Sequence, residues 1–215
     1  MNTTVSDRQI EIIEAAAKLL TNSGVSGLTI KNLAKEMKFS ESAIYRHFES
    51  KEDIILSMLD FVLSGAGKAT FIVMDSSLST TEIIKTMFLS QFSYFSKHPH
   101  LAVAIFSDGL LEASERINSK ILDIMNSRKI ILEPLVKEAQ NKGEFTNEIA
   151  VEEIIHILMG SVRLLMYQWR VSYFRFDLYQ KGEKLLDSIL KLIVAWWKTH
   201  QKQLSGCSYR IWGNY

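Results

Sequence analysis

The chain has 215 residues with a formal net charge of +1, and 47% of its residues are hydrophobic. This composition is that of an ordinary globular protein, and the near-neutral charge points to neither a nucleic-acid nor a membrane partner. A single cysteine excludes a disulfide framework within the chain, and only two prolines and ten glycines argue against a turn-rich all-β protein.

The sequence predicts neither export nor membrane insertion. Acidic residues interrupt the first 30 positions, which is unlike a signal peptide. The most apolar stretch, 86–107, contains several polar residues and Pro99, so it has no run near the roughly 18 apolar residues that a membrane span requires. We expect a soluble, cytoplasmic protein in which two buried helices meet at Pro99.

The N-terminal quarter is predicted to fold into short helices. Apolar residues recur there at spacings of three and four, and Ser, Thr or Asp stands where each helix needs an N-cap. Gly24 supplies the left-handed residue that commonly ends a helix, and Ser50 with Asp53 resembles a capping box. The predicted helices cover 7–22, 30–37 and 41–48, and a fourth opens at residue 50.

Longer helices are predicted for the rest of the chain, with no strand and no internal repeat. Pro134 lies inside one of them and is expected to kink or break it. The Lys142-Gly143-Glu144 segment ends that helix. The predicted helices cover 81–97, 98–111, 114–141, 147–175 and 178–203.

The predicted helices 30–37 and 41–48 have features of a DNA-binding unit. Helices joined by a three-residue turn and braced by a preceding helix are the ingredients of a helix-turn-helix. Ile44 and Phe48, four residues apart, can anchor the second helix. Its opposite face offers small or polar groups that let the backbone approach a DNA groove.

The segment from Gly24 to Lys51 resembles the DNA-binding domain of the TetR family of bacterial transcriptional regulators. Spacing and residue type agree at consecutive positions, most specifically at Leu28-Thr29-Ile30 and from Ser40 to Phe48. The likeness covers residues 7–60 well, and the remainder agrees in helical character and length.

The resemblance implies an all-α fold. An N-terminal three-helix helix-turn-helix DNA-binding domain, residues 1–51, would precede a larger C-terminal helical domain for ligand binding and dimerisation, residues 52–205. It assigns no role to the tail, residues 206–215.

The turn between the second and third predicted helices departs from the family pattern at two positions. Lys38 replaces the usual glycine, and because a positive φ costs a lysine about 1 kcal/mol, we expect the turn to relax. Phe39 replaces a small aliphatic residue and implies altered packing of the turn.

Roles for the DNA-facing residues follow from the resemblance. Arg46 is predicted to read guanine, with a phosphate contact or a solvent position as the open alternatives. Tyr45 is predicted to contact phosphate and sugar, with burial in the core as its alternative. Residues 1–51 carry a net charge of only +1, so the motif and not the charge supports this prediction. The predicted DNA-binding residues are Thr29, Ser40, Ser42, Ala43, Tyr45, Arg46, His47 and Lys51.

The last two long helices are apolar on more than one face, which indicates a partner surface beside the monomer core. A plain monomeric core is the alternative. The residues predicted to form the dimer interface are Ile154, Leu158, Leu165, Leu186, Ile189, Leu190, Ile193 and Trp197.

Aromatic residues, methionines and two polar side chains in the middle helices are candidates for an effector cavity, although ordinary core packing explains each one equally well. His156 and Arg163 lie among apolar residues and could hold an anionic effector or satisfy a buried group. The residues predicted to line the cavity are Met87, Phe88, Phe92, Phe95, Phe106, Met125, Met159, Arg163 and Tyr167.

No enzyme motif is present, and no catalytic residue, metal site or cofactor is predicted. His98 and His100 have no carboxylate or cysteine nearby to complete a metal site. The predicted function is that of a homodimeric regulator, a repressor released from a palindromic DNA operator by a small hydrophobic or amphipathic effector, with no membrane partner. The alternative is a helical ligand carrier or protein-interaction module that no longer binds DNA, which Lys38, Glu41 and the low charge would suit.

Overall fold

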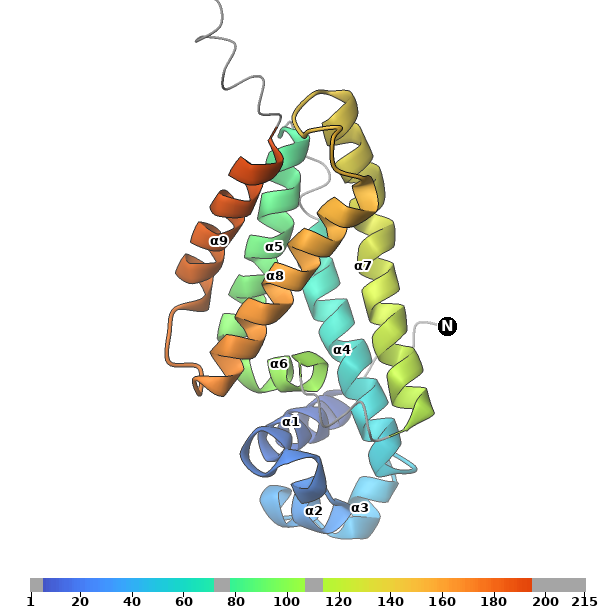
Figure 1. The fold of residues 1–215 in the computed structure, drawn as a ribbon. Helices are drawn as coiled ribbons and strands as arrows, with labels where there is room; N and C mark the ends of the chain where they lie inside the picture. The colour runs from blue at the N-terminus through green and yellow to red at the C-terminus, as the bar shows by residue number, and fades with distance from the viewer. Residues whose placement is uncertain (1–5, 72–77, 107–113, 195–215) are drawn as a thin grey trace, which may run out of the picture.

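The structure is a computed structural model that describes residues 6–71, 78–106 and 114–194, and this part of the chain folds into α-helices with only an isolated bridge between Phe145 and Val194. Three helices at one end, of which the second and third are short, lead through the fourth helix into a larger helical body (Figure 1). The helices are α1 (Asp7–Gly27), α2 (Ile30–Met37), α3 (Glu41–Tyr45), α4 (Lys51–Phe71), α5 (Thr80–Lys97), α6 (Pro99–Phe106), α7 (Glu115–Asn141), α8 (Val151–Val171) and α9 (Leu178–Ile193).

Side-chain caps begin these helices where the sequence predicts them. The Ser6 hydroxyl accepts a hydrogen bond from the Gln9 backbone N–H and begins α1. Thr29 caps α2 in the same way, and Ser50 accepts from the Asp53 N–H at 3.1 Å at the start of α4. Each cap satisfies a backbone donor that the first helical turn leaves without a partner, which fixes where the helix starts.

Several helix ends differ from the prediction. α3 ends at Tyr45, because the His47 N–H turns back to the Ile44 carbonyl. α9 ends at Ile193, where Val194 is extended and pairs with Phe145. Pro134 does not break α7, which is continuous from Glu115 to Asn141.

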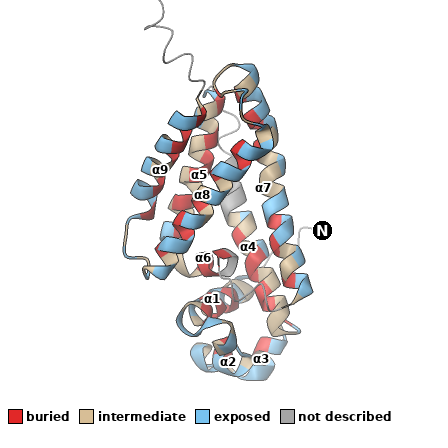
Figure 2. Ribbon diagram, viewed as in Figure 1, coloured by how far each residue is buried: buried red, intermediate tan, exposed pale blue. Residues whose placement is uncertain are grey.

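The buried side chains form one continuous core that joins the three N-terminal helices to the body (Figure 2). α1 packs against α2, α4 and α6, so the first three helices are held by the lower part of α4 and by α6 (Figure 1). α5 packs against α4, α7 and α9, and α8 packs against α6, α7 and α9. α4 and α6 are therefore the helices of the body against which α1 packs.

The turn between α2 and α3 does not relax, contrary to the expectation for Lys38. This residue is left-handed, with φ 56° and ψ 40°, and the Phe39 N–H donates to the Ala34 carbonyl at 2.8 Å. Phe39 packs against the core and lies under the Arg8 guanidinium, 5.1 Å from the ring centroid. These contacts hold the turn in the geometry that a glycine would adopt without strain.

Replacing Lys38 by glycine should therefore stabilise the protein. The left-handed region costs a residue with a Cβ about 1 kcal/mol, and Lys38→Gly removes that cost. We expect the melting temperature to rise by roughly 2–4 °C for a chain of this size. The control is Lys35→Gly, which places glycine inside α2 and should lower the melting temperature. A Lys38→Gly variant that melts below the unmodified protein would contradict this interpretation.

Glu144 stabilises the start of α5 from the loop after α7. Its carboxylate accepts hydrogen bonds from the Thr81 N–H at 2.8 Å, the Thr81 hydroxyl at 2.6 Å and the Thr80 N–H at 3.4 Å. Partial burial alone would raise the pKa of Glu144, but these hydrogen bonds outweigh it and lower the pKa below 4.5. A carboxylate at a helix N-terminus is favoured by the helix dipole as well.

We expect Glu144→Gln to cost about 1–2 kcal/mol at neutral pH, because charge-assisted hydrogen bonds are replaced by weaker ones. The pKa of Glu144 is lower in the folded state, so its contribution is complete above pH 4.5 and is lost as the pH falls through the folded pKa. Urea unfolding at several pH values should show the variant and the parent converging in acid. Glu148→Gln, an exposed neighbour, should show no such pH-dependent difference.

Candidate DNA-binding face and effector cavity

The third helix, α3, presents a polar face to solvent because its apolar anchor residues are buried in the core. Ile44 is fully buried and Phe48 is 5% exposed, so both anchor α3 against the rest of the N-terminal unit. Tyr45, between them in sequence, is 52% exposed. Burial of Tyr45 in the core, the alternative left open by the sequence, is therefore wrong, and its ring is free to contact a ligand.

The residues predicted to contact DNA lie together at the end of the molecule formed by α2, α3 and the start of α4 (Figure 1). Ser42 is exposed on α3 and Arg46 is exposed directly after it, and the Ser40 and Ser42 hydroxyls are 2.9 Å apart. Thr29 is exposed at the N-terminus of α2, and Ala43 and His47 are half-buried. Helix N-termini favour anions, so this end of the molecule suits a phosphate backbone.

Two contacts fix the orientation of α3 and α4 in this unit. The Gln9 side-chain amide donates to the His47 carbonyl at 3.4 Å, which ties α1 to the end of α3. The half-buried Lys51 donates to the Val25 carbonyl at 3.4 Å, which ties α4 to the end of α1. The first position of α4 is therefore set by the same unit that holds the recognition helix.

The helical body encloses a cavity of about 360 Å³ among α4, α5, α6, α7 and α8. Its deeper walls are apolar, with Val62 of α4, Phe88 and Phe95 of α5, and Phe106 of α6. The structure brings seven of the predicted cavity residues together on its lining: Met87, Phe88, Phe95, Phe106, Met125, Met159 and Arg163.

Two predicted cavity residues lie elsewhere. Phe92 is fully buried and its ring packs on Gly182 of α9, where an added Cβ would come within 2.3 Å of a ring carbon. Phe92 lies about one helical turn from Phe88 and from Phe95, but it is rotated around α5 relative to both. Its ring therefore faces α9. Tyr167 lines a smaller adjoining hollow on the outer side of α8.

Most of the polar lining of the cavity was not predicted from the sequence. Arg128 and Lys129 of α7 line it on one side, and His156 of α8, a candidate left without an assigned role, lines it on the other. The Lys129 ammonium forms an ion pair with Glu152 at 2.7 Å. Burial lowers the pKa of the Arg128 guanidinium. Arg128 lies in the polar stretch Asn126–Lys129, and this pattern does not distinguish a cavity from a surface position.

The predicted dimer interface is wrong for seven of its eight residues. They are between 0 and 7% exposed, so they belong to the core of the single chain and cannot contact a partner: Ile154, Leu158, Leu165, Leu186, Ile189, Leu190 and Ile193. Trp197 lies outside the described residues. α8 carries apolar residues on two faces, and its predicted residues, Ile154, Leu158 and Leu165, lie on the inward one.

α8 has exposed positions along its length (Figure 2), and several of them carry apolar residues. Ile157, Leu164, Tyr167 and Val171 are 39 to 57% exposed, and Gly160 is exposed among them. The neighbouring outer face of α9 is mostly polar, with Lys181, Lys184, Ser188 and Lys191 exposed beside Leu192. We call the residues Ile157, Gly160, Leu164, Tyr167 and Val171 the α8 stripe.

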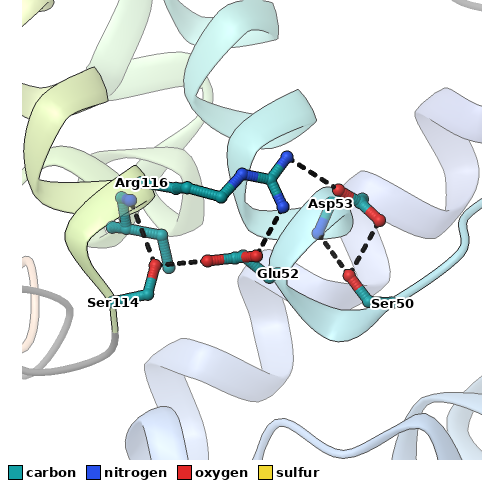
Figure 3. A network of polar contacts seen from close by, with 6 residues as sticks. Ser50, Glu52, Asp53, Ser114 and Arg116 are labelled. Atoms are coloured by element: carbon teal, nitrogen blue, oxygen red, sulfur yellow. Dashed lines mark hydrogen bonds and ion pairs between the residues drawn. The ribbon is translucent and has the colours of Figure 1, made fainter.

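A polar network joins the start of α4 to the start of α7 (Figure 3). The Arg116 guanidinium donates to Glu52 at 2.6 Å and to Asp53 at 3.3 Å, and the Ser114 hydroxyl also donates to Glu52. Ser50 in turn contacts Asp53. Since both α4 and α7 line the cavity, this network connects the cavity walls to the base of the N-terminal unit.

Neither a metal site nor a membrane-spanning helix is found among the described residues. No group of three or more His, Cys, Asp or Glu side chains there is arranged to hold a metal ion. None of the helices in those ranges is long and apolar enough to cross a membrane.

The fold and the site together define a helix-turn-helix regulator with an effector cavity in its body. Residues 12–58 match the family described as bacterial regulatory proteins of the tetR family, and residues 71–195 match the C-terminal region of YsiA-like proteins. The chain belongs to the TetR family and is a DNA-binding, ligand-responsive transcriptional regulator.

Curated relatives include nucleoid occlusion factors named SlmA. The protein from Marinomonas sp. (strain MWYL1) is 26% identical over 170 residues, which cover 76% of this chain and 85% of the relative. The protein from Vibrio atlanticus (strain LGP32) is 26% identical over 176 residues, which cover 81% and 90%.

Solved structures with the same fold include fatty acid and steroid regulators. The fatty acid degradation regulator FadR of Bacillus halodurans has a TM-score of 0.77 at 18% identity and covers 87% of this chain and 97% of its own. The ketosteroid regulator KstR2 of Mycobacterium tuberculosis has a TM-score of 0.76 at 20% identity, with coverage of 89% and 97%. FadR of Bacillus subtilis, in complex with stearoyl-CoA, has a TM-score of 0.72 at 21% identity, with coverage of 86% and 97%.

Proposed function

We propose that the chain acts in the cytoplasm as a homodimeric repressor, which binds a palindromic operator and is released by an anionic amphipathic effector. In this proposal residues 1–51 bind DNA and residues 52–205 bind the effector and the second copy. The observation that carries it is the exposed polar face of α3, joined through α4 to a body that contains an apolar cavity. A two-fold dimer would place one α3 in each half-site, about 34–36 Å apart for half-sites one helical turn apart.

Binding to the operator is tested by fluorescence anisotropy with the DNA upstream of the protein's own gene, over a series of salt concentrations. Phosphate contacts release counterions, so the affinity should fall steeply as salt rises. An affinity independent of salt and of sequence would instead favour the alternative of a carrier module that no longer binds DNA.

The chemistry of the cavity lining supports an effector with an apolar body and an anionic head. Arg128, Lys129 and Arg163 line the cavity together with a single acid, Glu152, which pairs with Lys129. The lining is therefore positive overall, beside walls of phenylalanine, methionine and aliphatic side chains. The complex of the Bacillus subtilis regulator with stearoyl-CoA is a case in which an amphipathic anion binds this fold.

The effector must also favour one state of the protein. A ligand shifts the equilibrium only by its differential affinity for the two conformations. An effector that moves α7 away from α4 would pull on the ion pairs that Arg116 forms with Glu52 and Asp53. The first turn of α4, which begins at Lys51, would then shift. The two copies of α3 would then no longer fit successive major grooves.

The preference for an anionic head is tested by competition against the fluorescent probe 1-anilinonaphthalene-8-sulfonate. Dodecanoate should displace the probe at lower concentration than dodecanol, because a carboxylate gains charge-assisted hydrogen bonds from guanidinium groups. Arg128→Gln should weaken the binding of dodecanoate by about tenfold or more and leave the binding of dodecanol unchanged. Equal displacement by the acid and the alcohol would refute the anionic head.

A further inference from the structure

The effector cavity meets a second hollow at the outer side of α8. This hollow has a volume of about 220 Å³ and is lined by Phe106, Gly160, Arg163, Leu164 and Tyr167. Three of these residues, Phe106, Gly160 and Arg163, also line the effector cavity. A Cβ added at Gly160 would find no atom within 4 Å, so the space beside this exposed glycine is open. The two hollows therefore adjoin at Gly160 on the outer face of α8, and we call this junction the window.

The window lies in the middle of the α8 stripe. The stripe residues are separated by three, four, three and four positions, which is the spacing of helices that pack along their length against another helix. None of the described segments of the chain covers this stripe, since Leu164 and Val171 are each 57% exposed. An apolar stripe of four helical turns needs a matching apolar surface, and a second copy of α8 supplies one.

The charges on α8 indicate how two copies pair. The helix begins with Glu152 and Glu153, and Arg170 and Arg175 lie at its end and just beyond it. An antiparallel pair places the acidic start of one copy against the basic end of the other, whereas a parallel pair places like charges together. Pairing about the midpoint of the stripe, Leu164, directs the acidic start of one copy toward the basic end of the other, where Arg170 lies in the last turn of α8.

The same register places a large residue over the window. Gly160, four residues before Leu164, then lies opposite the turn of the second copy that carries Tyr167 and Gln168. Of these two, Tyr167 belongs to the stripe and has the larger apolar surface, and it is 41% exposed in the single chain. A glycine facing a tyrosine is the small-against-large match by which packed surfaces interlock.

We propose that the partner's Tyr167 closes the window at Gly160, so that each effector cavity is completed by the second copy. The inference rests on the proposed dimer and adds that the outer wall of the site comes from the other subunit. Effector binding and dimerisation are then linked, and the effector strengthens the dimer by the same factor by which dimerisation strengthens effector binding.

Cross-linking tests the pairing in a Cys207→Ser background. Leu164→Cys should form a disulfide-linked dimer under mild oxidation, and a mixture of Gly160→Cys and Tyr167→Cys chains should form a linked heterodimer. If Leu164→Cys cross-links and the mixture does not, the further inference fails while the α8 dimer stands. If none of the variants cross-links, the dimer of the proposed function fails as well.

Heterodimers made from two differently tagged chains test the contribution of the partner. One chain carries Ile124→Trp, which fills its own cavity, so that only the other chain binds 1-anilinonaphthalene-8-sulfonate. Tyr167→Ala placed on the filled chain should weaken the binding of the probe to the open chain by about tenfold, which corresponds to about 1.4 kcal/mol. The same substitution placed on the open chain should have little effect.

The reverse pattern would show that Tyr167 acts on its own cavity and would overturn the proposal, as would equal binding in both heterodimers. Leu122→Ala, which removes an exposed apolar residue of α7 outside the cavity lining, is the matched control and should bind the probe normally in either chain.

Discussion

Arg46→Ala is expected to abolish the preference for the operator over unrelated DNA, whereas Lys51→Ala should weaken binding to every sequence alike. Arg46 is exposed directly after the last residue of α3. A guanidinium can read guanine through two hydrogen bonds, so the loss should be about 1–3 kcal/mol for the operator alone. Lys51 stands at the first position of α4. A phosphate contact there affects all sequences and should reduce the salt slope by about one unit.

Anisotropy titrations with operator and scrambled duplexes, at two or more salt concentrations, separate the two roles. Lys137→Ala is the control, because this exposed lysine of α7 lies in the body and pairs with Glu133. If Arg46→Ala weakens both duplexes equally, Arg46 contacts phosphate and the base-reading role is wrong. If neither variant changes binding, the predicted DNA face is not used.

Gly182→Val is expected to be among the most destabilising single substitutions in the chain. Gly182 is buried where α9 crosses α5, and a Cβ there would lie 2.3 Å from one carbon of the Phe92 ring and 2.4 Å from another. The ring is fully buried, so it has no free space to enter. Overpacking of this kind costs about 1–3 kcal/mol and more where the backbone must move.

Thermal unfolding should show a fall in melting temperature of roughly 6–12 °C for a loss of about 3 kcal/mol. Ser188→Val, on the exposed side of the same helix, provides the control and should change stability by less than about 0.5 kcal/mol. A double variant, Gly182→Ala with Phe92→Leu, should recover part of the loss because the smaller side chain makes room. Unchanged stability in Gly182→Val would mean that α5 and α9 are packed less closely than the structure shows.

Local sequence determined the N-terminal unit almost completely. The caps Ser6, Thr29 and Ser50 begin their helices through hydrogen bonds to backbone groups three residues away. Ile44 and Phe48 lie one turn apart, so their burial turns the polar side of α3 outward. These interactions span only a few residues, which is why a pattern in the sequence was sufficient to find them. The relaxed turn at Lys38 was wrong because contacts of the neighbouring Phe39 outweigh the strain of one residue.

The body was predicted as helices, but only the tertiary structure decided which face of each helix points inward. α8 carries apolar residues on both sides, and its periodicity is equally consistent with Leu158 inside and Leu164 outside or with the reverse. Burial depends on where α6, α7 and α9 lie, and no local pattern encodes those distances. The cavity is decided in the same way, since it is a space left between five helices. Arg128 and Gly160 line it only because of where distant segments among the described residues lie.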